Sequence, residues 1–478
     1  MKNIAIIGFG VTGQATLRYF LEQAKNNNVS DSPDGIYKIS VFDSKTESDF
    51  EDVSKEIDKY KTEGVEFNFE KTDFVEDEFD LIMVSPGVPL NLPVLLRAKE
   101  KNIPIKNDIT LFIENWRNIG AGKIVGVTGS NGKTTIVNLL YKYLQDSQID
   151  SIMAGNIGNS PLDILGGFKN KTDNESDVIV VLELSSFQLE AFQPEHYLDV
   201  CLISNLSSNH LDRYNGNMQK YADAKMNGID PQKTDVVLCA DDDGIKKYVL
   251  PKIKNKKVSL ISFETAIDQV GQKGIYMDSE NDLVSKDSDL TKKVFTRIND
   301  RRLLGIHNLY NIAMVYGVLD FLDVDLKNDE TIRNFKGLEH RIEFVRELDS
   351  VKYINDSKSS SPTATKVAIE SLTKEKNIIL ILGGNDKGMN FEVLIEPVSD
   401  FVEKIILLPG DIDKKIIKTL SEIVEIEKVD NLVGAVKLAR EIAPKKGFVL
   451  LSPAATSFKL YKNYEERGEH FKNLIKGL

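Results

Sequence analysis

The sequence predicts an α/β protein built from mostly parallel sheets and divided into three domains. Apolar, β-branched runs alternate with helical patterns along nearly the whole chain, an alternation typical of parallel sheets flanked by helices. The length of 478 residues is too great for one hydrophobic core. Changes of pattern near residues 113–122 and 326–338 predict domains at 1–115, 116–336 and 337–478.

The predicted strands are short apolar runs, many of which end in glycine or polar residues, as buried strands do. They cover residues 3–10, 38–44, 79–87, 123–129, 178–184, 199–205, 377–384, 404–410 and 447–455. Helical patterns follow two of these strands, at 13–27 and 134–146. The polar segment "NNNVSDSPDG" (26–35) predicts a surface loop.

Composition and charge exclude several classes of partner. The net charge is −12, and basic residues gather only in short runs such as 252–257, which weighs against nucleic acid or an anionic membrane as the main partner. The two cysteines, Cys201 and Cys239, lie in apolar runs and are expected to be reduced core thiols. No apolar stretch approaches the ~20 residues that span a bilayer. We therefore expect a soluble, cytoplasmic protein.

A glycine-rich loop follows the first predicted strand. The segment "GFGVTG" (8–13) matches GxGxxG between a strand and a helix, and Asp43 ends the next strand, as a ribose-binding carboxylate would. Such turns serve many ligands, and the interval from Gly13 to Asp43 exceeds the usual spacing of about 20 residues. A dinucleotide, a related nucleotide and a plain tight turn all remain open from this loop alone.

A second loop, "GVTGSNGKTT" (126–135), carries a more specific signal. It ends like a phosphate-binding loop, although Gly126 lies one residue outside the usual position of the first glycine. Backbone N–H groups at a helix N-terminus form an anion cradle. Lys133 would add a charge for the β- and γ-phosphates, and the Thr134 hydroxyl would ligate Mg²⁺. The alternative is a solvated turn that happens to contain Gly-Lys-Thr.

Further metal ligands are expected at the ends of the next strands. Glu183 closes an apolar strand, where core packing alone would favour an apolar residue. His210 and Asp212 lie in the loop after the following strand. Because open α/β sheets bind ligands beyond the carboxyl ends of their strands, Glu183 and His210 are expected to converge on the phosphate loop. A histidine in a loop can equally be an ordinary hydrogen-bonded group.

The motifs taken together resemble those of the Mur ligases. "TGSNGKTT" is similar to the ATP loop of that family and accounts for the displaced glycine. The other matching segments are "AGNIGNSP" (154–161), "LELSSFQLE" (182–190), "SNHLDRY" (208–214), "GIHNLYNIA" (305–313), "GLEHRIEFV" (337–345), "NDSKSSSPTAT" (355–365), "LGGNDKGMNF" (382–391) and "LSPAATSFKLYKNYEERG" (451–468). They span nearly the whole chain.

The resemblance implies a Rossmann-like N-terminal domain, a central P-loop ATPase-like domain with a mostly parallel sheet, and a Rossmann-like C-terminal domain. "SSFQLE" and "SPAATSF" favour the member that adds D-glutamate to UDP-N-acetylmuramoyl-L-alanine in peptidoglycan precursor synthesis. That reaction uses ATP and an acyl-phosphate intermediate, and the enzyme is expected to be a monomer. The alternatives are a sibling ligase, a folylpolyglutamate-type ligase and, more remotely, an NAD-dependent dehydrogenase fused to an ATPase.

The resemblance also assigns the ATP and metal residues. The ATP-binding residues would be Gly129, Ser130, Asn131, Gly132, Lys133, Thr134, Thr135, Asn308, Asn311, Arg341, Asp356 and Lys358. The catalytic residues would be Lys133, His210, Lys225, Arg341 and Lys358. Two Mg²⁺ ions are expected, the first on Thr134 and Glu183 and the second on His210. Asn209 stands where an Asp often precedes the metal-binding histidine, so the geometry of the second metal is open.

Two further groups of residues would bind the other substrates. The UDP-substrate residues would be Val11, Thr12, Asp43, Ser44, Lys45, Asn156 and Gln188, and the D-glutamate residues would be Lys387, Ser457, Phe458 and Tyr464. Lys45 stands where an Arg is common in the family, which keeps the charge but loses the bidentate fork. Phe458 and Tyr464 also depart from the commonest family choices.

Lys225 has two opposed interpretations. Read alone, a lysine in the helical segment "YADAKMNGI" is a solvated surface cation. The family implies a carbamylated lysine fifteen positions after the metal-binding His210. CO₂ adds only to a neutral amine, so this hypothesis requires a site that lowers the lysine pKa. The resulting carbamate would help to hold the second Mg²⁺.

Overall fold

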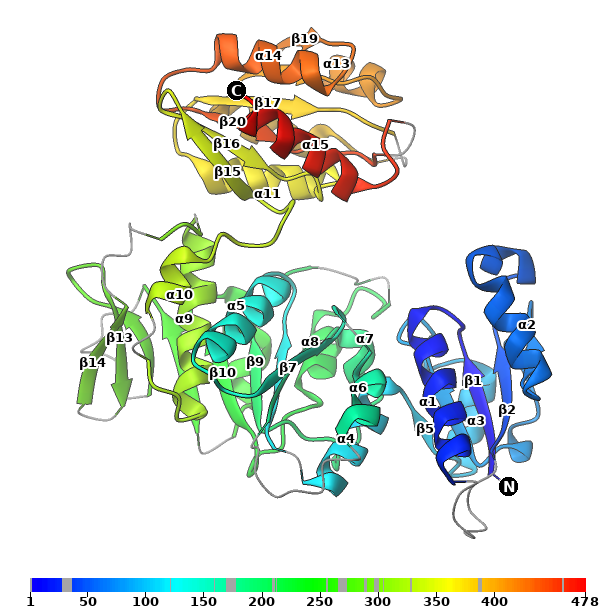
Figure 1. Ribbon diagram of the computed structural model, residues 1–478. Helices are drawn as coiled ribbons and strands as arrows, with labels where there is room; N and C mark the ends of the chain where they lie inside the picture. Colours follow the sequence, from blue (N-terminus) through cyan, green and yellow to red (C-terminus); the bar gives the residue numbers. More distant parts are fainter. Residues whose placement is uncertain are drawn as a thin grey trace. The chain divides into compact units, whose positions relative to one another are not determined.

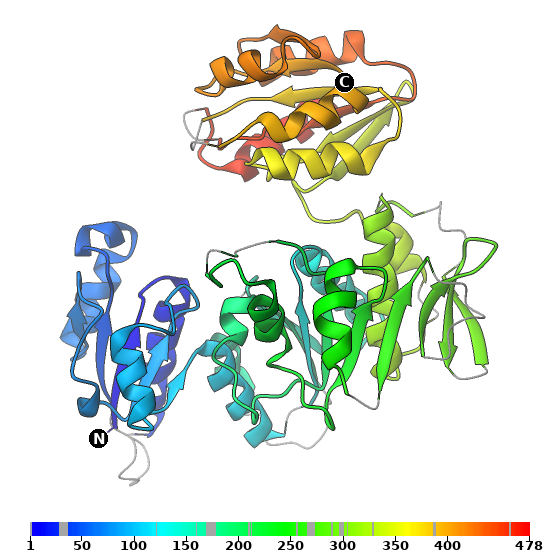
Figure 2. The ribbon, with the colours of Figure 1, turned by 180° about the vertical axis from the view of Figure 1, so that it is seen from behind.

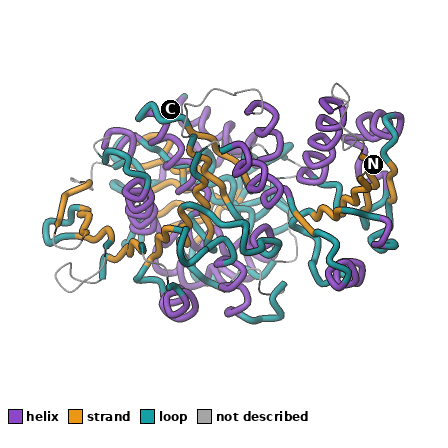
Figure 3. The backbone as a smooth tube through the Cα atoms, turned by 90° about the horizontal axis from the view of Figure 1, so that it is seen from below, coloured by secondary structure: helices purple, strands orange, loops and turns teal. Residues whose placement is uncertain are grey.

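The computed structural model describes most of the chain. The described residues are 2–27, 37–120, 122–158, 160–168, 178–208, 211, 213–254, 257–264, 273–287, 290–295, 301–303, 305–326, 329–385, 389–457 and 460–478. Within these residues the strands form three sheets, of five, nine and six strands. Helices flank the strands in each sheet (Figures 1 and 3). The predicted α/β class is therefore confirmed.

The first sheet has the order β3-β2-β1-β4-β5, and every neighbouring pair is parallel. Its elements are β1 (Lys2–Ile7), α1 (Val11–Asn27), β2 (Tyr37–Phe42), η1 (Glu47–Val53), α2 (Ser54–Thr62), β3 (Glu66–Asn68), η2 (Glu76–Glu78), β4 (Leu81–Val84), α3 (Pro93–Glu100) and β5 (Ile105–Lys106). Ile4 and Ile6 pack on one face and Ala5 and Ile7 on the other, because successive strand side chains point to opposite faces. The strand order reverses between β1 and β4, where such sheets bind ligands.

The second sheet has the order β14-β13-β12-β11-β10-β9-β6-β8-β7. The elements of this domain are α4 (Asp108–Ile119), β6 (Ile124–Thr128), α5 (Lys133–Asp146), β7 (Ser151–Gly155), α6 (Pro161–Phe168), β8 (Ile179–Glu183), α7 (Ser186–Leu189), β9 (Val200–Ile203), α8 (Met218–Met226), β10 (Asp235–Cys239), η3 (Ile245–Val249), η4 (Leu250–Lys252), β11 (Val258–Ser262), β12 (Gly274–Met277), β13 (Leu283–Asp287), β14 (Leu290–Phe295) and α9 (Ile306–Phe321). The strands from β7 to β12 are parallel, whereas β13 pairs antiparallel with β12 and β14. This antiparallel extension lies at one end of the sheet (Figures 1 and 2), and the sequence patterns had not indicated it.

The third sheet has the order β15-β16-β20-β17-β18-β19, with only β15 and β16 antiparallel. Its elements are α10 (Asp329–Asn334), β15 (Glu343–Leu348), β16 (Val351–Asn355), α11 (Pro362–Leu372), β17 (Ile378–Leu382), η7 (Glu392–Leu394), α12 (Ile395–Phe401), β18 (Val402–Leu407), α13 (Asp413–Leu420), β19 (Glu425–Lys428), α14 (Leu432–Ile442), β20 (Phe448–Leu451) and α15 (Tyr464–Lys476). Helices α11, α12 and α13 cover one face, and α14 and α15 cover the other.

The chain divides into two compact units, one formed by residues 1–296 and 311–328 and the other by 297–310 and 329–478. The first unit contains the first and second sheets, and the second unit contains the third sheet. The limits of the three predicted domains stay predictions. Among the described residues, no helix combines the length and the apolar character needed to cross a bilayer.

Candidate active site

The phosphate-type loop lies between β6 and α5, at the carboxyl edge of the second sheet. Gly129 has φ 136° and Gly132 has φ 84°, and both values disfavour residues with a Cβ atom. A Cβ on Gly129 would lie 2.0 Å from the Ser204 Oγ atom, and one on Gly132 would lie 2.6 Å from the Asn311 Oδ1 atom. No side chain caps α5. The loop therefore presents the start of a 14-residue helix as an anion-binding end.

Lys133 is the first residue of α5, and its side chain turns back over the loop. The Lys133 Nζ atom donates to the Gly129 carbonyl at 2.9 Å and to the Ser130 carbonyl at 3.1 Å. Asn311 on α9 is buried, and its side chain approaches Gly132. Asn308 is also buried and lies three residues before Asn311, hence on the same side of the helix. The structure thus brings the expected phosphate loop and Asn311 together.

Glu183 ends β8, which pairs with β6 beside the loop. Its side chain is buried, and the Oε1 atom accepts a hydrogen bond of 3.1 Å from the Asn156 Nδ2 atom. Its Oε2 atom is also buried but has no hydrogen-bond partner among the described residues. A buried carboxylate oxygen without a partner is costly. This arrangement fits a hard cation such as Mg²⁺, which takes carboxylate oxygens.

Lys225 on α8 is only 1% exposed, so the surface-cation interpretation is wrong. Its Nζ atom donates to the Gly129 carbonyl at 2.9 Å and lies 3.4 Å from the Thr128 Oγ1 atom. Burial, and then the nearby charge of Lys133, lower the pKa of Lys225 to about 7. Its ammonium also lies 4.5 Å from the centre of the Tyr221 ring. These surroundings therefore favour the neutral amine, which carbamylation requires.

Three of the expected site residues lie outside the described part of the chain. They are His210 of the metal set and Lys387 and Phe458 of the D-glutamate set. Asp212 and Asn209, beside His210, also lie outside it. Their assignments stay predictions.

The glycine loop of the first sheet is fixed by Asp43. The Asp43 Oδ2 atom accepts the Phe9 N–H at 2.6 Å, and its Oδ1 atom accepts the Lys45 N–H at 2.9 Å. A Cβ on Gly13 would lie 1.9 Å from the Gly8 carbonyl oxygen, which explains the third glycine. The Asp43 carboxylate therefore ties the loop after β1 to the loop after β2. This backbone role was not part of its predicted role in substrate binding.

The other expected UDP-substrate residues fall into exposed and buried groups. Val11 is 82% exposed at the start of α1, where an apolar side chain suits a ligand ring better than water. Ser44 and Lys45 are exposed in the segment after β2, and Thr12 follows Val11 in the first turn of α1. Gln188 is buried, and its Oε1 atom accepts the Ser185 N–H at 2.9 Å. Gln188 therefore helps to cap α7.

The second unit holds a buried carboxylate at the end of β16. Asp356 is 1% exposed, its Oδ2 atom accepts the Ser452 hydroxyl at 2.6 Å, and its Oδ1 atom accepts the Ile342 N–H at 3.2 Å. Burial raises the pKa of Asp356 to about 6. Arg341 precedes Ile342 in the same turn. The expected pair of Arg341 and Asp356 is thus brought to one place.

Lys358 and Tyr464 lie on neighbouring segments of this unit. The Lys358 N–H donates to the His340 carbonyl at 2.9 Å, and the Lys358 ammonium lies 5.3 Å from the centre of the Tyr464 ring. Burial raises the pKa of the Tyr464 hydroxyl to about 12. Ser457 is buried and its carbonyl accepts the Tyr461 N–H at 3.1 Å. The assignment of Ser457 to the D-glutamate set stays a prediction.

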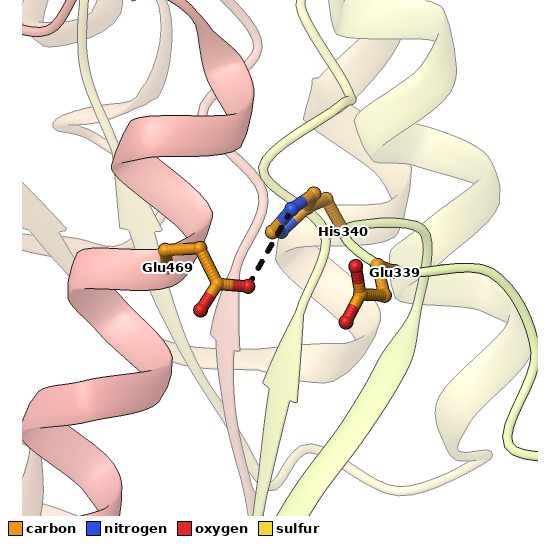
Figure 4. Close-up of side chains that lie close together, drawn as sticks. All are labelled: Glu339, His340 and Glu469. Atoms are coloured by element: carbon orange, nitrogen blue, oxygen red, sulfur yellow. Dashed lines mark ion pairs between the residues drawn. The ribbon is translucent and has the colours of Figure 1, made fainter.

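Glu339, His340 and Glu469 form a cluster that resembles a metal-ligand set (Figure 4). The His340 Nε2 atom lies 3.9 Å from the Glu469 Oε1 atom. The cluster already contains a cation, because the Lys472 ammonium lies 2.9 Å from Glu339 and 2.8 Å from Glu469. We therefore read it as a structural ion cluster.

Arg467 is a residue of this unit that the sequence patterns did not single out. It is 2% exposed and donates to the Ser357 carbonyl at 2.8 Å, to the Ser357 hydroxyl at 2.9 Å and to the Ala455 carbonyl at 3.4 Å. Burial lowers the pKa of Arg467 to about 10. Its spacing was the available signal, because Arg467, Phe471 and Ile475 share one helical face and the last two are core residues.

Comparisons with protein families agree with the three-part layout. The model of the Mur ligase MurD-like N-terminal domain matches residues 2–107, that of the Mur ligase middle domain matches 127–319, and that of the Mur ligase glutamate ligase domain matches 340–455. Each matched range falls on one of the three sheets, in the same order along the chain.

Several curated relatives match along the whole chain. A protein of Clostridium tetani is 32% identical over 100% of this chain and 97% of its own length, and one of Clostridioides difficile is 33% identical over 100% and 99%. A protein of Francisella philomiragia is 36% identical over 86% of this chain and 90% of its own. All three are named UDP-N-acetylmuramoylalanine–D-glutamate ligase.

Solved structures share the fold at low identity. The UDP-N-acetylmuramate–alanine ligase MurC of Thermotoga maritima superposes with a TM-score of 0.54 at 17% identity, covering 100% of both chains. The MurF ligase of Thermotoga maritima in complex with ADP gives a TM-score of 0.54 at 21% identity, covering 84% of this chain and 90% of that one. The full-length relatives, whose identity exceeds 30%, decide the assignment: this chain belongs to the Mur ligase family.

Proposed function

We propose that this chain is an ATP-dependent ligase that joins D-glutamate to the L-alanyl carboxylate of UDP-N-acetylmuramoyl-L-alanine, with release of ADP and phosphate, in peptidoglycan precursor synthesis. The full-length identity to relatives that carry this activity in their names supports the choice of substrates. The phosphate loop supports the use of ATP, as does the nearby Glu183 Oε2 atom, which is buried without a hydrogen-bond partner from the residues that the structure describes.

The chemistry needs an activated carboxylate, because a carboxylate ion is a poor electrophile. Transfer of the ATP γ-phosphoryl group to the L-alanyl carboxylate gives an acyl phosphate. The amine of D-glutamate then attacks the carbonyl carbon, and the tetrahedral intermediate collapses to an amide and phosphate. Such a reaction depends on positioning and on charge stabilisation.

Residues of the phosphate loop, of the neighbouring strand ends and of α9 would hold ATP and the metal ions. The loop Gly129–Thr135 would bind them through backbone N–H groups, Lys133 would stabilise charge on the transferring group, and Asn308 and Asn311 on α9 would contact the adenine. Thr134 and Glu183 would hold one Mg²⁺ and His210 a second. The cation, when bound, would neutralise charge on the phosphate oxygens.

Lys225 would be carbamylated in the active enzyme. In that step the neutral ε-amine attacks CO₂, a nitrogen–carbon bond forms and one proton leaves the nitrogen for water. The buried position of Lys225 beside Lys133 and the carbonyl of Gly129 supports this, because its surroundings favour the uncharged amine. The anionic carbamate would face the metal of His210.

The remaining substrates would bind elsewhere. Val11, Thr12, Asp43, Ser44 and Lys45 would hold the uridine diphosphate, and Asn156 and Gln188 would contact the sugar–peptide part. Lys387, Ser457, Phe458 and Tyr464 would bind D-glutamate. The γ-phosphate of ATP would be bound by Arg341, with Asp356 and Lys358 beside it. Because the reaction consumes ATP and a UDP-sugar, we place the enzyme in the cytoplasm, and we propose that it acts as a monomer.

Phosphate release tests the proposal directly. The chain is incubated with ATP, Mg²⁺ and UDP-N-acetylmuramoyl-L-alanine, and D-glutamate, L-glutamate, L-alanine or D-alanine is added singly. We expect sustained phosphate release with D-glutamate only, together with a product of the mass of the amide. Phosphate release that depends on a different amino acid would show a sibling ligase. If no amino acid stimulates phosphate release, the chain is not a ligase of this kind. Sedimentation of the active enzyme checks the monomer.

A further inference from the structure

Arg213 makes an unusually complete set of contacts within the first unit. Its Nη2 atom donates to the Val88 carbonyl at 3.0 Å and to the Glu190 Oε2 atom at 2.8 Å, and its Nη1 atom donates to the Gly87 carbonyl at 3.3 Å. Its guanidinium lies 4.9 Å from the centre of the Phe187 ring. The Arg213 and Glu190 side chains are mostly buried, at 15% and 16% exposure. A lysine could not make these contacts, because they use the planar fork.

One end of this set lies in the first sheet, at the loop after β4. The Ser85 hydroxyl donates to the Gly8 carbonyl at 2.8 Å, and the Val88 N–H donates to the Ser85 carbonyl at 2.9 Å. A Cβ on Gly8 would lie 2.9 Å from the Ser85 Cβ atom. The segment 85–88 therefore packs against the glycine loop, at the point where the strand order reverses. Arg213 holds the far end of this segment.

The other end lies in the second sheet, after β8. Phe187 and Glu190 belong to the short turn that begins with the Ser185 cap, two residues after Glu183. Glu183 carries the buried Oε2 atom that has no hydrogen-bond partner in the described part of the chain and fits a metal ion. Arg213 thus joins the segment beside the nucleotide loop of the first sheet to the segment that follows the metal carboxylate of the second.

A substrate with a nucleotide at one end and a reacting carboxyl at the other must bind to both regions at once, the glycine loop of the first sheet and the segment after Glu183 in the second. Its covalent length is fixed, so the spacing of the two half-sites decides whether the carboxyl reaches the phosphate. Misplacement of a reacting group by about 1 Å can cost about a hundredfold in rate. We propose that Arg213 is a positioning residue that fixes this spacing for the UDP-linked substrate. The inference rests on the proposed function for the identity of that substrate.

The test compares a whole substrate with its fragment. Arg213→Lys and Arg213→Met are assayed with UDP-N-acetylmuramoyl-L-alanine, and the affinity of UDP alone is measured by calorimetry. We expect kcat/KM for the whole substrate to fall roughly tenfold to a hundredfold in both variants. The Kd of UDP and the KM of ATP should stay within about twofold, because each ligand occupies one half-site. Glu190→Gln should show a smaller loss in the same direction.

Arg18→Met supplies the matched control. Arg18 on α1 pairs with Asp163 on α6 at 3.1 Å and so joins the same two parts of the chain, but both side chains are more than a third exposed. This variant should keep wild-type kinetics. Unchanged kcat/KM in both Arg213 variants would overturn the proposal. A loss of UDP affinity as large as the loss of kcat/KM would also overturn the proposal, since such a result would show damage to the first half-site alone. If the wild-type enzyme binds neither UDP nor UDP-N-acetylmuramoyl-L-alanine, the proposed function itself is refuted.

Discussion

Lys225 in the first unit and Lys472 in the second are both buried, at 1% and 7% exposure, yet their surroundings differ in kind. Lys472 forms ion pairs with Glu339, Glu343 and Glu469 at 2.8–3.1 Å. Although burial opposes its charge, hydrogen bonds to these carboxylates raise the pKa of Lys472. Lys225 meets a carbonyl, a hydroxyl and an aromatic ring, and among the described residues no carboxylate pairs with it.

The difference shows that the groups around a buried lysine determine whether its side chain stays charged or becomes neutral. Carboxylate partners make a permanent cation that holds segments together, as Lys472 does with α15 and the turn before β15. A buried amine with a like charge nearby is pushed toward its neutral form, which can act as a nucleophile toward CO₂. Burial alone therefore does not distinguish structural lysines from reactive ones.

The largest effect is expected for Lys133→Ala. This change removes the cation that we propose to stabilise the transferring phosphoryl group, and we expect phosphate release to fall at least about a hundredfold. The same change should raise the pKa of Lys225, because the charge of Lys133 helps to lower it. Lys142→Ala, an exposed position on the same helix α5, is the control and should retain activity. Near-normal turnover of Lys133→Ala would refute the assignment of the loop.

Lys225→Ala should lose most activity, roughly tenfold to a hundredfold if the carbamate stabilises one charged group. Formate, acetate or bicarbonate should restore part of it by supplying the missing carboxylate oxygens. Lys220→Ala, on an exposed turn of the same helix α8, is the control. Its activity should equal that of the wild-type enzyme and should not change when a carboxylate is added. A fully active Lys225→Ala enzyme without additive would leave Lys225 no part in the reaction.

The two lysines should affect stability with opposite sign. In CO₂-free buffer, Lys225→Met is expected to raise the free energy of unfolding at pH 7 by about 1 kcal/mol, because it removes a disfavoured buried charge. Lys472→Met should lower it by about 2 kcal/mol, because it leaves carboxylates without their cation, two of them well exposed. Calorimetric melting of each variant measures both changes.

The pH dependence of these changes follows from the pKa directions. The pKa of Lys225 is about 7 in the folded chain and 10.5 in the unfolded one, so its penalty grows as pH falls from 10.5 to 7 and is constant below. The gain in Lys225→Met should therefore disappear as pH rises toward 10.5. The stabilisation by Lys472, whose folded pKa is raised, is complete below its unfolded value and is lost only at higher pH. Changes of equal sign in the two variants would contradict the comparison.

Much of this layout could be predicted from local patterns, and the misses have physical causes. Runs of β-branched residues marked the parallel strands because those strands are buried on both faces, as β8 is. The strands β13 and β14 were missed because "LVSKD" and "LTKKVF" alternate weakly and carry charges. Burial of Lys225 could not be read from its helix, since it depends on contacts with Gly129, about a hundred residues away in the chain. Ser357, the partner that accepts the shortest hydrogen bonds of Arg467, is equally distant in the chain, although the spacing of Arg467 marked a buried face.

The smallest expected effect concerns Asp356, a buried acid whose carboxylate accepts hydrogen bonds from the Ser452 hydroxyl and the Ile342 N–H. Burial raises its pKa to about 6, while the hydrogen bond from Ser452 lowers it in part. Because the folded pKa lies above the unfolded value of 3.8, this group favours folding fully below 3.8, and that contribution is lost as pH rises through 6. Ser452→Ala removes the hydroxyl, so the pKa of Asp356 should move above 6 and the decline in stability should extend to higher pH. Ser371→Ala, whose hydroxyl only caps the end of α11, is the control. Unfolding by urea between pH 4 and 8 measures the curve. A decline that still ends near pH 6 in Ser452→Ala would show that the Ser452 hydroxyl does not lower the pKa of this carboxyl.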